Sequence, residues 1–157
     1  MDNTKTAVLT RLLSQIEKHI PLKAEINTNV SKANVGWHID HTLKVIHRVY
    51  TILEKSDPNT YKKNFNLLRS TFFILGWFPR GKVKAPEEVT PPKLILEKDL
   101  YAQLQEAKEH LKNIETLHKN TFFVHHIFGM LSKAQTLTFL EMHTTHHLKI
   151  MNAILKA

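Results

Sequence analysis

The chain has 157 residues, of which 42% are hydrophobic and 23% charged, and its formal net charge is +8. This composition is typical of a single globular domain that buries a real core. The absence of cysteine excludes disulfides, iron–sulfur clusters, thiolate zinc sites and a cysteine nucleophile, and four glycines without a glycine-rich phosphate loop argue against a nucleotide-binding fingerprint.

Helical periodicity dominates the N-terminal third of the chain. The first predicted helix carries Leu9, Leu12, Leu13, Ile16 and Ile20 on one face and is ended by Pro21. A polar stretch, 27–34, follows this helix.

The second predicted helix begins where either Ser31 or Asn34 is placed to cap it. It runs to about Ser56, where Asp57-Pro58-Asn59 ends it. Its apolar arc consists of Ile39, Leu43, Ile46, Val49, Tyr50 and Leu53. A shorter helix is predicted from about 61 to 75, with Phe65, Leu68 and Phe72 on one side.

The longest irregular stretch, 76–95, holds four of the chain's prolines. We expect an ordered excursion that packs Trp77, Phe78 and Val83 against the helices. A third long helix, about 98–118, follows with leucine-rich 4-3-4-3 spacing, and 119–131 is predicted to be a loop.

The last helix is predicted to start near Ser132 or Lys133 and to run almost to the end of the chain. Gln135 stands three residues after Ser132, as in a capping box. Four long amphipathic helices, one short helix and no sheet predict an all-α fold, a four-helix bundle in a single domain, 1–157.

Histidines on the last helix point to a metal site. His143 and His147 are four residues apart, about 40° around the helix axis and roughly 6 Å along it, so both rings can close on one ion. Random placement of 11 histidines gives about 0.7 such pairs, so spacing alone is weak evidence. Both rings, however, fall in the core stripe with Leu140 and Ile150, whereas His146 falls on a flank. The alternatives are a 143/146 pair or two core histidines with ordinary hydrogen-bond partners.

A third ligand has to come from a facing helix. The candidates are His38, His41, His110 and His118. Periodicity places His41 at the edge of its apolar arc and mildly prefers His38, while His19 and His47 are expected on the surface. Three protein ligands with an open coordination position are typical of a catalytic metal site rather than a structural one.

Four segments resemble a known family, or one branch of it, when taken together. Residues 34–41, Asn-Val-Gly-Trp-His-Ile-Asp-His, resemble the (Ser/Thr)-Val-Gly-…-His start of the second helix in the DinB/YfiT-like superfamily of proposed metalloenzymes. Residues 126–132 are similar to its His-Pro-x-Phe-Gly-x-Leu-(Ser/Thr) loop, with Ile127 where the family often has proline. Residues 143–148 resemble its terminal His-x-x-His-His pattern. Residues 79–86 are similar to a loop in one uncharacterised branch. The resemblance covers about 30–157.

The resemblance implies a four-helix bundle with up-down-down-up connections. It also implies a divalent metal, zinc, nickel or iron, held by His41, His143 and His147. His38 and Asp40 are then candidates to orient His41, and His126 and His146 are candidate residues around the site. Trp37, Trp77 and Phe128 are expected in the core or in a pocket wall.

Several metal chemistries are excluded by the residues around these histidines. Thr144 follows His143, so the His-Glu-x-x-His motif of metalloproteases is absent, and the single Glu-x-x-His pair, Glu115 and His118, falls short of the two that a di-iron carboxylate bundle uses. Characterised relatives in the superfamily include thiol-dependent transferases and isomerases. A low-molecular-weight thiol co-substrate is therefore one hypothesis, and metal-dependent hydrolysis of a small substrate is another. The competing class is a non-enzymatic, stress-associated ligand-binding bundle.

Charge and chain layout indicate the partners. The lysines are scattered, and the densest basic patch is Lys82-Val83-Lys84 beside Arg80. We expect small anionic substrates rather than nucleic acid. The first residues lack the layout of a signal peptide, and the apolar stretch 72–78 is too short to span a bilayer, so a cytoplasmic protein is expected. A homodimer is a further expectation from the resemblance.

Overall fold

The computed structural model describes residues 2–76 and 87–156. Within them the chain is mostly helical, with a small two-stranded sheet near the C-terminal third. The helices are α1 (Asp2–Glu17), α2 (Val35–Lys55), α3 (Leu67–Leu75), α4 (Glu97–Thr116) and α5 (Lys133–Leu155), and the strands are β1 (Phe122–His125) and β2 (Gly129–Ser132). Short 3-10 turns lie at Ile20–Leu22, Pro58–Thr60 and Glu87–Val89.

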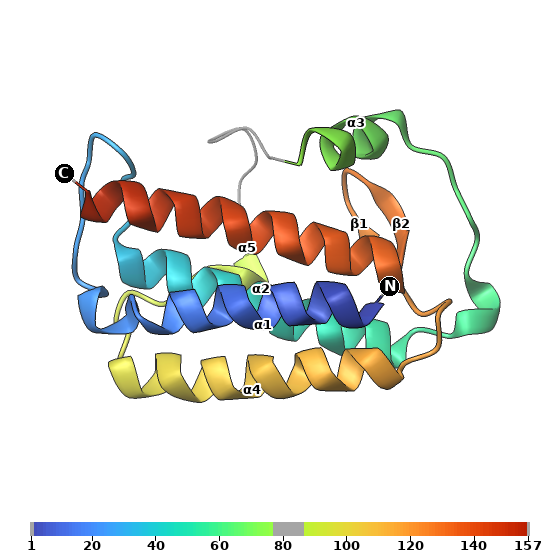
Figure 1. The fold of residues 1–157 in the computed structure, drawn as a ribbon, viewed down its shortest axis with the longest axis horizontal. Helices are drawn as coiled ribbons and strands as arrows, with labels where there is room; N and C mark the ends of the chain where they lie inside the picture. Colours follow the sequence, from blue (N-terminus) through green and yellow to red (C-terminus); the bar gives the residue numbers. More distant parts are fainter. Residues whose placement is uncertain (1, 77–86, 157) are drawn as a thin grey trace.

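The four long helices lie side by side along the length of the molecule (Figure 1). Helix α2 packs against α4 and α5, and α1 packs against the same two helices from the other side. Helices α1 and α5 run in one direction in Figure 1, and α2 and α4 run in the opposite direction. The arrangement gives α2 two neighbours on two different faces, which matters for the histidines described below.

The interior is built from the predicted apolar stripes. Fully buried leucines and isoleucines come from all four long helices, and they include Leu9, Leu13, Ile16, Ile39, Leu43, Ile46, Leu100, Leu104, Leu111, Leu137 and Leu140. Each such side chain contributes about 1.5–3 kcal/mol relative to an exposed position. The predicted apolar stripes of α2, α4 and α5 are therefore buried as expected, whereas α1 ends at Glu17 rather than at Pro21, and Ile20 lies in a separate 3-10 turn.

Two predicted helix caps are present. The Asn34 side chain accepts a hydrogen bond of 2.8 Å from the Trp37 amide at the start of α2. Ser132 and Gln135 form the reciprocal bonds of a capping box at the start of α5. Each cap satisfies amide groups that a helix N-terminus leaves without partners, and so fixes where the histidines fall along α2 and α5.

The predicted absence of a sheet is wrong, because part of the predicted 119–131 loop is a β-hairpin. Strands β1 and β2 pair antiparallel, with Phe122 opposite Ser132 and His125 opposite Gly129. The His125 ring closes the turn: its Nδ1 accepts hydrogen bonds from the amides of Ile127 and Phe128. Gly129 has a φ of 69°, a left-handed conformation that glycine adopts readily.

The short helix begins later than predicted. Residues 61–66 are irregular, and α3 begins only after Asn66, whose side chain caps it by accepting from the Arg69 amide. The buried Arg69 guanidinium donates to the carbonyls of Phe128 and Met130 and so ties this segment to the hairpin. Tertiary hydrogen bonds, rather than helix propensity, set the path of the chain here.

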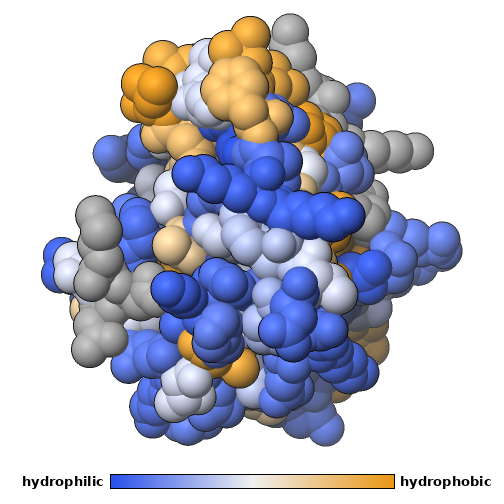
Figure 2. Space-filling model, turned by 90° about the vertical axis from the view of Figure 1, so that its right-hand side faces the viewer, coloured by the Kyte–Doolittle hydropathy of each residue, from blue (hydrophilic) through white to orange (hydrophobic). Residues whose placement is uncertain are grey.

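Helix α3 keeps much of its apolar surface exposed. Figure 2 shows hydrophobic side chains gathered at the top of the molecule, where α3 lies. The exposed large apolar residues of this region are Phe65, Leu67, Leu68, Ile74 and Leu75. Of the three residues predicted on one side of this helix, Phe65 lies before α3 begins, Leu68 is exposed, and Phe72 packs against the core.

The predicted irregular stretch 76–95 lies mostly outside the described residues. This applies to Trp77, Phe78, Val83 and the Arg80–Lys84 patch. The described part, from Glu87 onward, places the buried Val89 against α2. None of the described helices is long and apolar enough to cross a membrane.

Candidate metal centre

Helices α2 and α5 bring three histidines together. His41 from α2 and His143 and His147 from α5 each offer one ring nitrogen, and these nitrogens all lie within 4.8 Å of one another. The ring centroids are 5.1 Å apart for His41 and His143, 4.8 Å for His41 and His147, and 4.5 Å for His143 and His147. His41 and His147 are buried, and His143 is half-buried. We call these residues the three-histidine group.

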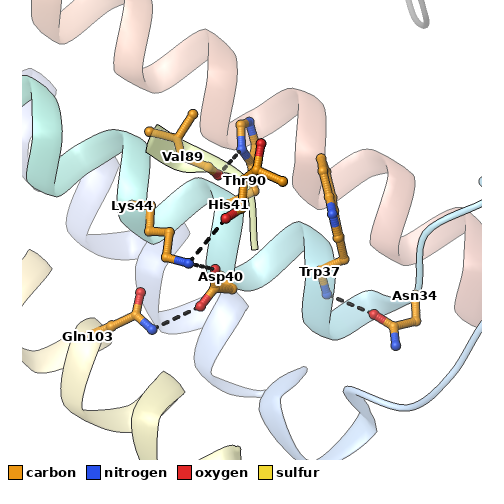
Figure 3. A network of polar contacts seen from close by, with 8 residues as sticks. All are labelled: Asn34, Trp37, Asp40, His41, Lys44, Val89, Thr90 and Gln103. Carbon is orange, nitrogen blue, oxygen red and sulfur yellow. Dashed lines mark hydrogen bonds and ion pairs between the residues drawn. The ribbon is translucent and has the colours of Figure 1, made fainter. Parts of the chain in front are cut away.

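The His41 ring is held by two contacts. Its Nδ1 donates a hydrogen bond of 2.9 Å to the Val89 carbonyl, drawn as a dashed line in Figure 3. Because a carbonyl only accepts, the proton of the neutral ring lies on Nδ1 and the Nε2 lone pair is free. The Trp37 ring stacks on the His41 ring at 5.0 Å with an interplanar angle of 18°. The ring is thereby fixed in both tautomer and orientation.

A chain of hydrogen bonds orients His147. Its Nδ1 lies 3.0 Å from Nδ1 of the buried His38, and the Nε2 of His38 lies 3.0 Å from the Ser31 hydroxyl. This order leaves Nε2 of His147 as its available nitrogen. For Nε2 of His147 to present a lone pair, the proton of the neutral ring must lie on Nδ1. Nδ1 of His147 then donates to Nδ1 of His38, and Nε2 of His38 donates to the Ser31 hydroxyl. The sequence predicted that His38 orients His41. In the structure, Nδ1 of His38 is instead hydrogen-bonded to Nδ1 of His147.

Asp40 belongs to a separate polar network beside His41 (Figure 3). Its buried carboxylate forms a 2.7 Å ion pair with Lys44 and accepts a 3.0 Å hydrogen bond from Gln103 of α4. Lys44 also reaches the Thr90 carbonyl at 3.5 Å. Asp40 thus ties α2 to α4 and, through Lys44, to the segment after Val89, and its negative charge raises the pKa of His41.

Burial keeps the three rings neutral. Loss of hydration lowers the pKa of His41, a shift that the Val89 hydrogen bond and the charge of Asp40 partly offset. Burial lowers the pKa of His143 and His147 well below the ordinary value, and the neighbouring histidines lower it further. A neutral imidazole is the form that binds a metal ion, so all three rings are in the ligand form at neutral pH.

One atom of the group lacks a partner. The Nδ1 of His143 is buried, and no hydrogen bond to it is found among the described residues. A buried polar atom without a partner costs about 1–3 kcal/mol. An ion held by the three rings would give His143 the interaction it lacks, so the residues fit a divalent metal. Zinc, nickel and iron all accept three imidazoles.

The other predicted histidines divide into neighbours and distant residues. The His146 ring meets the His147 ring edge-on at 5.2 Å, beside the group but not in it. His126 is exposed and stacks on His125 in the hairpin turn. His118 accepts from the Asn120 amide beyond α4, and His110 lies against Tyr50. Neither of the last two joins the three-histidine group.

Several features of this region were not predicted from the sequence. The Val89 carbonyl and the Ser31 hydroxyl belong to irregular segments and carry no periodic signal. A second group of candidate ligands, His47, Glu106 and His110, lies between α2 and α4. The expectation that His47 is a plain surface residue is wrong, since both its ring nitrogens are buried. The i,i+4 spacing of Glu106 and His110 is the sequence signal that points to this group.

A cavity of about 260 Å³ lies elsewhere, between α1, α3 and α5. Its lining includes Lys5, Phe73 and Met142, but none of the three histidines.

Comparison of the chain with protein-family models, with curated proteins and with solved structures found no match.

Proposed function

We propose that the chain is a metal-dependent enzyme of the DinB/YfiT type, with an up-down-down-up four-helix bundle and one divalent ion held by His41, His143 and His147. The observation that carries the proposal is the convergence of three ring nitrogens within 4.8 Å. Support for this comes from the rings being neutral and from two of them having their other nitrogen in a hydrogen bond. Orientation of metal-binding histidines through their second nitrogen is a general feature of metal sites.

A divalent ion with three neutral imidazoles keeps a net charge near +2, so it polarises a bound water or thiol and lowers its pKa. The chain supplies the rest of the site. His38 and Ser31 hold His147, and Val89 and Trp37 hold His41. Three protein ligands leave coordination positions for a substrate atom.

We propose an exogenous low-molecular-weight thiol as co-substrate: the thiol gives up its proton to solvent, its sulfur forms a bond to a carbon atom of a small, anionic acceptor, and the acceptor's leaving group departs with the electron pair of the broken bond. A chain without cysteine has no thiolate of its own to offer. The net charge of +8 favours anionic molecules. Hydrolysis through an activated water is the alternative outcome of the experiment below, and a protein that binds no metal would favour the non-enzymatic ligand-binding class.

The first test is metal analysis of protein produced without added metal, followed by thermal unfolding with and without zinc or nickel. About one equivalent of bound ion in the protein as produced, and a metal-dependent rise in Tm, are expected for the wild type, whereas a His143→Gln/His147→Gln variant should lose this ion and show a smaller rise in Tm. A metal-free chain whose Tm ignores both ions would overturn the metal assignment.

The second test asks whether the ion meets a thiol. Glutathione is added to the zinc-loaded protein, and the zinc absorption edge is recorded. We expect the edge to show sulfur entering the coordination shell of the zinc ion. The control is a glutathione analogue in which serine replaces cysteine, so that the thiol is absent. If the zinc edge does not change and the zinc-loaded protein hydrolyses a small ester or amide, the thiol-transfer hypothesis is replaced by metal-dependent hydrolysis.

A further inference from the structure

A second group of metal-ligating side chains lies on another face of α2, toward α4. His47 comes from α2, and Glu106 and His110 come from one turn of α4. One ligand atom from each lies within 4.8 Å of the other two. The layout repeats that of the three-histidine group, with an i,i+4 pair on one helix and a single histidine on α2. We call it the His-Glu-His group.

His47 carries two polar atoms that the protein leaves without hydrogen bonds. Both ring nitrogens are buried and have no hydrogen-bond partner among the described residues. The backbone of Gln103 lies close enough to favour the charged form of the ring, but it does not meet the geometry of a hydrogen bond. A neutral ring needs a donor for one nitrogen and an acceptor for the other, so this environment is incomplete.

The Glu106 carboxylate lies between the two imidazoles. One oxygen is 3.9 Å from Nδ1 of His47, and the other is 3.6 Å from Nε2 of His110. These separations exceed those of hydrogen bonds and leave space between the three groups. Tyr50 stacks on the His110 ring at 4.0 Å with an interplanar angle of 16°, which fixes the ring plane.

A simple ion pair explains the arrangement poorly. Burial lowers the pKa of both His47 and His110, even though the charge of Glu106 acts in the other direction. Both rings are then neutral at pH 7, so their attraction to the carboxylate is weak. Neutral rings around one carboxylate are the state in which a cation is bound.

We propose that His47, Glu106 and His110 form a second binding site for a divalent transition-metal ion such as Zn²⁺. Two imidazoles and a carboxylate suit zinc and its neighbours, and are too rich in nitrogen for calcium or magnesium. The Glu106 side chain is 62% exposed, so the remaining coordination positions face solvent. A bound ion links α2 to α4 and stabilises the folded chain by mass action. The site does not depend on the proposed enzyme activity.

Zinc titration by calorimetry tests the site on two backgrounds. The wild type is expected to bind two Zn²⁺ ions, and His110→Gln one. The His143→Gln/His147→Gln variant is expected to bind one ion, and addition of His110→Gln to it none. His118→Gln, just beyond α4, is the matched control and should leave the count unchanged. An unchanged zinc count in His110→Gln on both backgrounds would overturn the proposal.

Anomalous scattering at the zinc edge gives a second readout that needs no variant. Wild-type crystals grown with excess Zn²⁺ should show a peak within bonding distance of His47 and His110. A peak at the three-histidine group alone would overturn the second site and leave the proposed function intact. A peak at the His-Glu-His group alone would support the second site and contradict the metal assignment of the proposed function.

Discussion

Helix α2 carries two histidine clusters on two faces, and they differ in what surrounds them. The three-histidine group faces α5 and has two buried rings, each with its second nitrogen hydrogen-bonded. The His-Glu-His group faces α4 and includes an exposed carboxylate, and both nitrogens of His47 lack hydrogen bonds within the described part of the chain. The same i,i+4 spacing therefore gives an oriented, buried set of ligands in one place and a looser, half-exposed set in the other.

The difference teaches that helical spacing supplies proximity but not orientation. His41 is fixed by Val89, which belongs to a turn between α3 and α4, and His147 is fixed through His38. The only comparable contact in the second group among the described residues is Tyr50 stacked on His110. Since orienting partners are worth 10–100-fold in metal affinity, the three-histidine group is expected to bind an ion more tightly.

The largest expected effect comes from one substitution made at two positions of α2. His41→Gln should weaken tight zinc binding more than 100-fold, because it removes a ligand rather than an orienting partner. His47→Gln, six residues later on the same helix, should leave the tight site unchanged. Competition with a chromophoric chelator measures both affinities. Equal losses in the two variants would show that the two groups are not separate.

The next effect tests the orienting chain of the three-histidine group. His38→Phe keeps a ring of similar size but removes the acceptor for His147, so we expect a 10–100-fold loss of zinc affinity with an unchanged ion count. His38→Gln retains an acceptor and should recover part of the loss. If Phe and Gln behave alike in the same chelator assay, His38 only fills space.

Part of this arrangement was predictable from the sequence, for a physical reason. On α5, leucine and isoleucine neighbours define the interior face, so periodicity placed His147 inward. On α2, periodicity mildly preferred His38 to His41, and the structure shows why it could not choose: both are buried, at 4% and 5% exposure. Both rings lie near His147, but the His41 ring also lies 5.1 Å from the His143 ring. This difference depends on helix packing rather than on the α2 sequence.

The hairpin shows the complementary limit. Strands of four residues are too short for alternation to stand out, and their pairing depends on the His125 ring and on Gly129 at the turn. The late start of α3 depends on Arg69 reaching the hairpin carbonyls. Contacts between segments 60 residues apart leave no periodic trace, whereas helix caps such as Asn34 and Ser132 are local and were readable.

A pH measurement separates the hairpin histidines from the two groups on α2. Burial lowers the pKa of His125 to about 4, with a smaller contribution from His126. The unfolded chain binds this proton near pH 6.5 and the folded chain only near 4, so the stabilising effect is complete above 6.5 and is lost as the pH falls toward 4. One such group changes the free energy of unfolding by at most about 1.4 kcal/mol per pH unit.

His125→Asn keeps an acceptor for the turn amides and removes the titrating ring. Urea unfolding of metal-free protein between pH 4 and 7 should therefore show a shallower fall in stability than in the wild type. The His126→Asn variant is the matched control and should change the slope much less, because burial is the larger cause of the lowered pKa of His125. Parallel curves for the wild type and His125→Asn would place the acid sensitivity elsewhere, for instance in the three-histidine group.

The smallest effect is expected at the carboxylate of the second group. Glu106→Gln should change the stability of the metal-free protein by no more than about 0.5 kcal/mol, because an exposed carboxylate near neutral rings gains little. Asp40→Asn, at a carboxylate that is only 3% exposed and paired with Lys44, should lose about 1–3 kcal/mol in the same urea experiment. Added zinc should stabilise Asp40→Asn through both groups but Glu106→Gln through the three-histidine group alone. Asp40→Asn should therefore gain more stability from zinc than Glu106→Gln does. A Glu106→Gln variant that gains as much stability from zinc as the wild type would leave α2 with a single metal-binding face.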